Sequence, residues 1–271
     1  MKTFEEKCFD FNNIIKNIAK TDSAVAYSGG VDSSLLLKEL CDAAKQAGTK
    51  VYAVTISSML NPVSEIEECK TTAEKFGAVH KVLEINSLEE AGISDNPKNR
   101  CYLCKKYMFS KLAELASIAG AKKIADGTNF DDLHTYRPGL KALAELGVVS
   151  PIAESGLTKA EVRTLASRYG IFSADKPSAP CMATRFPYGT RLTEKEIRKA
   201  ETAEEYIRSL GFYNVRVRVH GDIARIEVDS GDIQKLSELR DGVTAFLKSL
   251  GYGYVTLDLC GFVSGSMDKP V

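Results

Sequence analysis

The sequence predicts an α/β protein with a parallel sheet, followed by a small α+β domain. Across residues 1–172, short apolar runs alternate with helical patterns, the order expected of parallel strands joined by crossover helices. Residues 173–192 then form a loop with three prolines and no periodicity, which is typical of a functional loop or a linker. Residues 193–271 show a helix, a strand pair, a helix and a closing strand.

The first domain begins with an amphipathic helix, because apolar side chains recur at near-helical spacing over residues 3–19. Short apolar runs predict buried strands over 24–27, 51–56, 79–85, 123–125 and 149–152. Helices are expected over 35–40, 62–76, 107–119 and 158–169. The last of these starts with the capping pair Thr158 and Glu161. In such a sheet, ligands bind at the carboxyl ends of the strands.

The second domain, residues 193–271, begins with a charged helix over 193–210. A strand over 214–220 alternates valines with basic residues, so Arg216 and Arg218 point to the same face and suit bidentate binding of an anion. A turn leads to a strand over 223–228, a helix over 231–250 and a strand over 254–259. This order predicts an α+β module.

The stretch 24–37 organises the first domain, because it holds a strand, a loop and a helix start. Gly29 and Gly30 allow a sharp turn and bring backbone N–H groups close to a ligand. Serine hydroxyls add donors where the helix begins: Ser28, Ser33 and Ser34. No Gly-Lys-Ser/Thr follows, so this is not the kinase-type loop. Asp32 would repel a triphosphate unless a metal lay between them, and the loop therefore predicts a nucleotide site with Mg²⁺.

A second loop, residues 126–132, follows the predicted strand 123–125 and should emerge at the same edge of the sheet. Asp126 and Gly127 either line the nucleotide site or form a solvated turn, since Asp-Gly is a common turn dipeptide. Arg137, a little further on, either contacts phosphate or caps a helix.

Composition restricts the partners and the compartment. Lys and Arg together number 36, and so do Asp and Glu. The resulting net charge of zero gives no broad attraction for nucleic acid. We find no signal peptide and no apolar stretch long enough to span a bilayer, so a cytoplasmic location without a membrane partner is expected. Seven dispersed cysteines fit a reducing compartment better than a disulfide framework.

Cys101 and Cys104 form a Cys-x-x-Cys pair just before the helix expected over 107–119. The pair by itself is compatible with zinc, a redox disulfide or an iron–sulfur cluster, or with two ordinary buried cysteines. A zinc site would normally show two more Cys or His ligands at comparable spacing, and none accompanies this pair. If Cys181 joined the pair, three thiolates would leave one corner of a cubane cluster open for a small sulfur species. The remaining cysteines are expected to be structural: Cys8, Cys41, Cys69 and Cys260.

The segment Ser-Gly-Gly-Val-Asp-Ser at 28–33 resembles the PP-loop of the ATP pyrophosphatases. These enzymes have a Rossmann-like domain, cleave ATP between the α and β phosphates and adenylate an acceptor oxygen. Nearly all of the chain is similar to the LarE family, PP-loop sulfurtransferases that install sulfur in the nickel-pincer nucleotide cofactor of lactate racemase. This similarity also covers 136–141, 181–189, 215–218 and 254–259.

The resemblance implies roles for particular residues. Cys181 falls on the sulfur-bearing cysteine of the family. Some members sacrifice that sulfur and keep dehydroalanine, whereas others add a Cys-x-x-Cys pair and hold a 4Fe-4S cluster with three cysteines. The pair at Cys101 and Cys104 places this chain with the cluster type, whose catalyst is recyclable. Four residues match positions of the family's substrate pocket, with Arg216 and Arg218 at its phosphate: Arg185, Glu204, Arg216 and Arg218.

The implied reaction is attack of a substrate carboxylate on the α-phosphorus of ATP, with the loop and Mg²⁺ on Asp32 stabilising the pyrophosphate that leaves. A sulfur nucleophile, either sulfide on the cluster or the Cys181 thiolate, then displaces AMP and gives a thiocarboxylate. The implied partners are a pyridinium dicarboxylate mononucleotide and a sulfur donor, and the resemblance also predicts a homo-oligomer, a hexamer in the family. Two other functions stay open, namely a PP-loop tRNA thiolation enzyme and an adenine-nucleotide-binding protein without turnover.

Overall fold

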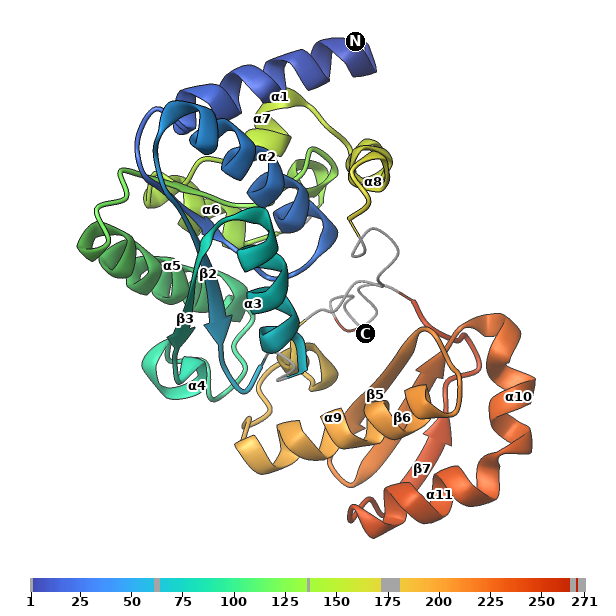
Figure 1. The fold of residues 1–271 in the computed structure, drawn as a ribbon. Helices are drawn as coiled ribbons and strands as arrows, with labels where there is room; N and C mark the ends of the chain where they lie inside the picture. The colour runs from blue at the N-terminus through green and yellow to red at the C-terminus, as the bar shows by residue number, and fades with distance from the viewer. Residues whose placement is uncertain (1, 61–63, 136, 172–180, 264–266, 268–271) are drawn as a thin grey trace. The chain divides into compact units, whose positions relative to one another are not determined.

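The computed structural model describes residues 2–60, 64–135, 137–171, 181–263 and 267 (Figure 1). The chain divides into two compact units, each considered by itself below. Unit 1 comprises Met1–Ser58, Pro62–Gly92 and Asn99–Ser178, and unit 2 comprises Met59–Asn61, Ile93–Lys98 and Ala179–Val271. Our linear domain prediction, with 1–172, a linker over 173–192 and 193–271, did not include the two short segments that precede residue 99 in unit 2. Residues 173–180 of the predicted linker lie outside the described part of the chain.

Unit 1 contains a parallel sheet in the order β3-β2-β1-β4 (Figure 1). Its strands are β1 Ser23–Ala26, β2 Val51–Ser57, β3 Val79–Glu84 and β4 Lys123–Ala125. Side chains alternate along β1, so that Val25 enters a core on one face of the sheet and Ala24 enters another core on the opposite face. The predicted parallel α/β class is confirmed.

Helices cover both faces of this sheet. The larger core receives side chains from α1 Phe4–Ile18, α2 Val31–Ala47, α3 Ser64–Phe76, α7 Pro151–Ser155 and α8 Lys159–Arg168. The smaller core receives Leu112 and Ala116 from α5 Arg100–Ile118. Three short helices complete the described part of unit 1: α4 Ser87–Glu90, η1 Asp131–His134 and α6 Gly139–Glu145. The layers are those of a doubly wound α/β fold.

Two element predictions in unit 1 were wrong. The run 149–152 is not a strand: Val149 makes a single parallel bridge with Ala125, and α7 begins at Pro151. Proline suits the first position of a helix because its fixed φ and missing N–H cost nothing there. The helix expected over 107–119 begins at Arg100 instead, so that Cys101 and Cys104 lie inside its first turns.

Unit 2 is an α+β unit with a three-stranded sheet in the order β5-β6-β7. Its elements are η3 Met182–Arg185, α9 Glu194–Ser209, β5 Val215–His220, β6 Ile223–Val228, η4 Ser230–Asp232, α10 Ile233–Glu238, α11 Arg240–Ser249 and β7 Tyr254–Leu257. β5 and β6 are antiparallel, as the predicted hairpin requires, and β7 runs parallel to β6. The single helix expected over 231–250 was wrong, because the chain forms three short helices with Leu239 between α10 and α11.

Asn96 joins the short segment 93–98 to the rest of unit 2. Its side-chain amide donates to the carbonyl groups of Phe186 and Pro187 at 3.0 and 2.8 Å. Asn96 is completely buried. Backbone hydrogen bonds from Gly189 to Asn96 and from Leu192 to Ser94 reinforce the junction. Asn96 also has a φ of 47°, a conformation that asparagine tolerates better than most residues. This segment is therefore a structural part of unit 2.

No helix in the described part of the chain is both long enough and apolar enough to cross a membrane.

Candidate functional site

The strand order reverses between β1 and β4, and at such a switch point a doubly wound sheet has a crevice outside the carboxyl ends of its strands. The chain leaves β1 towards β2 and β3 and then returns to β4 on the other side of β1. Ligands of doubly wound sheets bind where the strand order reverses in this way. The predicted phosphate loop follows β1 directly, and the loop 126–132 follows β4. The two candidate loops therefore meet at the expected point of the sheet.

Serine hydroxyls give the first loop its shape. Ser33 Oγ donates to the Gly30 carbonyl at 3.0 Å and lies 3.2 Å from Ser28 Oγ, and Ser34 Oγ donates to the Gly29 carbonyl at 3.4 Å. Ser33 and Ser34 are buried, whereas Ser28 and Gly30 are exposed. The N-cap Gly30 makes no side-chain cap on α2, which leaves the first helical turn suited to an anion. The exposed groups are thus the better candidates for nucleotide contact.

Two glycines allow close approaches that a side chain would prevent. Gly29 has a φ of 75°, and a Cβ there would lie 2.7 Å from Cys69 Sγ. A Cβ on Gly127 would lie 2.8 Å from the backbone nitrogen of Ser33. Gly127 therefore lets the second loop pack directly on the first turn of α2, a role that the sequence did not reveal.

Asp32 is held by two residues that sequence reasoning missed. Its Oδ2 forms an ion pair with Lys159 Nζ, and its Oδ1 accepts a 3.5 Å hydrogen bond from Asn129 Nδ2. Lys159 is the first residue of α8, directly after the capping residue Thr158. The capping pair in the sequence marks the start of this helix, but only the fold brings that start to Asp32.

Asp126 is buried and lies at the centre of a hydrogen-bonded cluster. Its carboxylate accepts from Thr128 Oγ1 and Ser150 Oγ, both at 2.6 Å, and Lys105 Nζ lies 3.8 Å from it. In addition, Arg137 pairs with Asp132 at 2.8 Å. The loop 126–132 is thus an ordered part of the crevice and not a solvated turn.

Cys101 and Cys104 lie one turn apart on α5, and Lys105 connects this turn to the crevice. Cys101 is exposed and Cys104 is half-buried, with its Sγ donating to Met108 Sδ at 3.3 Å. Lys105 follows Cys104 directly and reaches Asp126. The cysteine pair is therefore near the nucleotide loops within unit 1. Among the described residues, no group of three or more Cys, His, Asp or Glu is arranged to hold a metal ion.

Cys181 belongs to unit 2, where it precedes the short helix η3 and is exposed. Arg185 ends η3, and its Nη1 donates to the Cys181 carbonyl at 3.5 Å and to Thr184 Oγ1 at 2.9 Å. The other side of the Arg185 guanidinium donates to both carboxylate oxygens of Glu204, at 2.7 and 2.9 Å. Glu204 thus fixes the arginine that holds the turn bearing Cys181.

Glu204 itself is completely buried on α9. Besides Arg185, it accepts from the backbone N–H of Val217 at 2.9 Å and from Arg208 Nη2. These donors occupy both oxygens of its carboxylate. The geometry fits a positioning role better than direct contact with a substrate.

Arg216 and Arg218 are both buried on β5, and their surroundings differ. Arg218 makes two hydrogen bonds to Glu227 Oε2, at 3.0 and 2.9 Å, and a third to the Thr184 carbonyl at 2.9 Å. Burial, together with the charges of Arg185 and Arg218, lowers the pKa of Arg216 to about 10, although the charge of Glu204 acts in the opposite direction. A buried cation among other cations is stabilised when an anion approaches.

The remaining cysteines follow the expectation in part. Cys41 and Cys69 are buried, and burial raises the pKa of the Cys41 thiol to about 12 and that of Cys8 above its ordinary value. Cys260 is exposed and lies beyond the end of β7, so it is not one of the buried cysteines.

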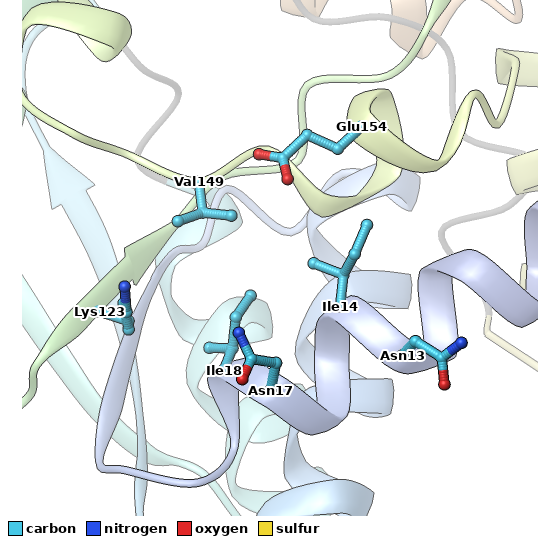
Figure 2. Close-up of a pocket in the computed structure, with 7 residues that line it drawn as sticks. All are labelled: Asn13, Ile14, Asn17, Ile18, Lys123, Val149 and Glu154. Atoms are coloured by element: carbon cyan, nitrogen blue, oxygen red, sulfur yellow. The ribbon is translucent and has the colours of Figure 1, made fainter.

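A separate pocket of about 330 Å³ lies in unit 1 (Figure 2). It is lined by Asn13, Ile14, Asn17, Ile18, Lys123, Val149 and Glu154. Lys123 begins β4, so this part of the pocket lies at the amino ends of the parallel strands. None of the predicted site residues lines it.

Comparison with known proteins agrees with this geometry. A family model described as a PP-loop domain matches residues 4–138. An uncharacterised protein of Synechocystis is 38% identical over 248 residues, which are 90% of this chain and 91% of that protein. The pyridinium-3,5-bisthiocarboxylic acid mononucleotide synthase of Lactiplantibacillus plantarum is 40% identical over 244 residues, 90% of this chain and 88% of that enzyme. The chain belongs to the LarE family.

Membership of the LarE family confirms the PP-loop resemblance and makes the chain a PP-loop enzyme. A tRNA-specific 2-thiouridylase of Rickettsia rickettsii is also similar, at 28% identity over 192 residues, but the match covers only 57% of this chain and 52% of that enzyme. The two similarities within the LarE family each cover 90% of this chain, which is far more than the match to the thiouridylase covers.

Proposed function

We propose that the chain is an ATP-dependent sulfurtransferase that adenylates a carboxylate of a pyridinium dicarboxylate mononucleotide and converts it to a thiocarboxylate. The observation that carries the proposal is the 40% identity to a synthase of the bisthiocarboxylic acid mononucleotide over 90% of the chain. The phosphate loop at the switch point of the sheet supports the use of ATP.

Adenylation takes place at the carboxyl end of β1. A carboxylate oxygen of the substrate attacks the α-phosphorus of ATP, the bond from that phosphorus to the bridging oxygen breaks, and pyrophosphate leaves. The backbone N–H groups at Gly29, Gly30 and the first turn of α2 bind the charge that develops on pyrophosphate. Ser28 is the exposed hydroxyl of the loop and binds the same phosphates, while Ser33 and Ser34 keep the loop in shape.

Magnesium fits Asp32, since a carboxylate in a partly open crevice provides the hard oxygen ligands that this ion prefers. When bound, the ion neutralises phosphate charge. Asp126 and Gly127 shape the opposite wall: Gly127 packs on Ser33, and Asp126 holds Lys105 towards the crevice.

Unit 2 binds the substrate's phosphate. Arg216 is the first candidate, because it is buried beside other arginines and an anion would therefore stabilise its charge. Arg218 supports it from the next position on the same face of β5, with its guanidinium directed by Glu227. Glu204 and Arg185 act by holding the turn that carries Cys181.

The sulfur step uses the cysteines. Sulfur attacks the carbonyl carbon of the acyl adenylate, the bond from that carbon to the AMP oxygen breaks, and AMP leaves. Cys101 and Cys104 fit as two thiolate ligands on one helical face, and Cys181 would be the third. A 4Fe-4S cluster held by these cysteines would carry the sulfide that the sulfur donor provides.

Pyrophosphate release tests the function. We expect the pyridinium dicarboxylate mononucleotide to stimulate release from ATP and to gain sulfur in the product, and Arg216→Ala to weaken the effect of the mononucleotide without weakening ATP binding. Stimulation by tRNA instead would favour the thiolation enzyme, and tight ATP binding without release under either condition would favour a nucleotide-binding protein.

Light scattering of the same sample tests the predicted homo-oligomer.

The cluster has a separate test. After anaerobic purification, we expect iron and acid-labile sulfide in equal amounts and a brown protein, and Cys101→Ala should lose both. Cys260→Ala is the matched control, because Cys260 is also exposed but has no assigned role. A colourless protein that loses sulfur mass at Cys181 in one turnover would show sacrificial chemistry instead.

A further inference from the structure

The ammonium group of Lys159 forms an ion pair with Asp32, the carboxylate that is expected to bind the metal. Lys159 Nζ pairs with Asp32 Oδ2, and Asn129 Nδ2 donates to Oδ1 of the same carboxylate. The Lys159 side chain is 39% exposed and that of Asp32 is 20% exposed. Both oxygens of Asp32 are therefore engaged in a crevice that solvent and ions can reach.

The backbone of Lys159 is fixed from both sides. Thr158 and Glu161 form a capping box at the start of α8, and the backbone N–H of Lys159 donates to Asp131 Oδ2 at 2.8 Å. Asp131 belongs to the loop after β4. The fold thus presents this side chain to Asp32, while its four-carbon stem leaves the ammonium free to change partners.

The same carboxylate cannot be shared fully by a lysine and a divalent cation, because the two positive charges repel each other. Phosphate groups of a nucleotide would offer the lysine a new anionic partner. We propose that Lys159 excludes divalent metal from Asp32 in the empty enzyme, and that the metal enters with ATP because the phosphates take over the ammonium. The proposal rests on the nucleotide site above, but not on the identity of the acceptor or on the sulfur step.

Binding of Mn²⁺ to the nucleotide-free protein, followed by electron paramagnetic resonance, tests this order. We expect wild-type protein to bind Mn²⁺ weakly, and Lys159→Met to bind it about fivefold more tightly, which is the upper end of the range for breaking a partly exposed ion pair. Lys159→Arg keeps a cation at this place and should stay weak. Asp32→Asn in the Lys159→Met background should lose the gained affinity.

Lys7→Met is the matched control. Lys7 on α1 pairs at 2.9 Å with Glu161 on α8, the helix that carries Lys159, so its removal breaks a partly buried ion pair that does not involve Asp32. We expect no change in Mn²⁺ affinity. Equal Mn²⁺ affinity in wild type and Lys159→Met would overturn the proposal, as would a gain that survives Asp32→Asn. Neither result depends on turnover, so an enzyme with another acceptor could still support it.

Discussion

Gly127 shows how one missing side chain shapes the nucleotide site. Its α-carbon packs against the backbone of Asp32 and Ser33, and a Cβ would come within 2.8 to 3.1 Å of three of those atoms. Backbone atoms at a helix start cannot move away cheaply, because the phosphate loop and α2 share them. The glycine therefore sets the distance between the two loops of the crevice.

We predict that Gly127→Ala weakens ATP binding at least about tenfold and destabilises unit 1 by about 1–3 kcal/mol, the usual cost of overpacking. Isothermal titration and urea unfolding measure the two effects. Gly231→Ala is the control, since a Cβ there meets nothing within 4 Å. Unchanged ATP affinity in Gly127→Ala would show that the two loops need not touch.

Glu204 is the second residue whose replacement should be informative. Removing one partner of a buried ion pair costs about 3–5 kcal/mol, whereas replacing both partners with apolar residues often costs much less. We therefore predict that Glu204→Met destabilises unit 2 strongly and that Arg185→Met in the same chain restores part of the loss. Thermal unfolding of both variants measures this. A double variant that is less stable than Glu204→Met would refute the pairing as the main role of Glu204.

At the residue scale, the sequence revealed the loop 28–34 because its chemistry is local. It did not reveal Lys159 or Asn129, since each becomes important only when distant segments meet at Asp32. The sequence also did not show that both carboxylate oxygens of Glu204 would be hydrogen-bonded. Alternation along β5 predicts which residues share a face of that strand, but it does not predict that α9, which carries Glu204, packs on it.

At the scale of elements, two helices begin with the same device. Thr3 with Glu6 caps α1, and Thr158 with Glu161 caps α8. In each case the threonine hydroxyl accepts from the backbone N–H of the glutamate, and the glutamate carboxylate accepts from the backbone N–H of the threonine. Only the second cap stands next to a residue of the nucleotide site. Comparison of these two caps therefore separates the contribution of a cap to stability from the function of the residue that the cap positions.

We predict that Thr3→Ala and Thr158→Ala each cost about 1 kcal/mol of stability, as loss of an N-cap usually does. Only Thr158→Ala should also weaken ATP binding, because it loosens the backbone that carries Lys159. Chemical unfolding and nucleotide titration on both variants give the comparison. Equal nucleotide affinities in the two variants would disprove the positional role of the cap.

Element predictions succeeded where the hydrophobic periodicity agreed with the residues that start and end a helix, as at α8 between Thr158 and Gly170. They failed at 149–152, because a short apolar run fits a strand or a helix equally well. Here Pro151 favours the start of a helix, and α7 begins at this residue. The start of α5 was misplaced because the segment before Cys101 lacks a strong N-cap: Asn99 makes no side-chain cap there.

At the scale of the whole molecule, one half-buried histidine in each unit, His80 and His220, makes stability depend on pH. Burial lowers the pKa of His80 and of His220, and Arg225 and Arg218 lower that of His220 further. The unfolded chain takes up these protons near pH 6.5, while the folded chain resists them. Their contribution to stability is complete above that pH and is lost as the pH falls through the folded pKa values.

We therefore predict a melting temperature that decreases between pH 7.5 and 5.5. His220→Gln should reduce the decrease, and adding His80→Gln should reduce it again, because the two residues lie in different units. Differential scanning fluorimetry across the pH series measures the slopes. A steeper decrease in His220→Gln would contradict the sign of the argument.

The short segment held by Asn96 has a consequence for protein engineering. Because unit 2 is assembled from three stretches of chain, no single cut yields two independent modules. A fragment starting at residue 179 would lack the carbonyl groups of Ser94 and Asn96 that accept from Leu192 and Gly189. Chimeras between relatives should therefore exchange residues 59–61 and 93–98 together with the C-terminal part, and recombination at the proline-rich loop alone would mix mismatched surfaces.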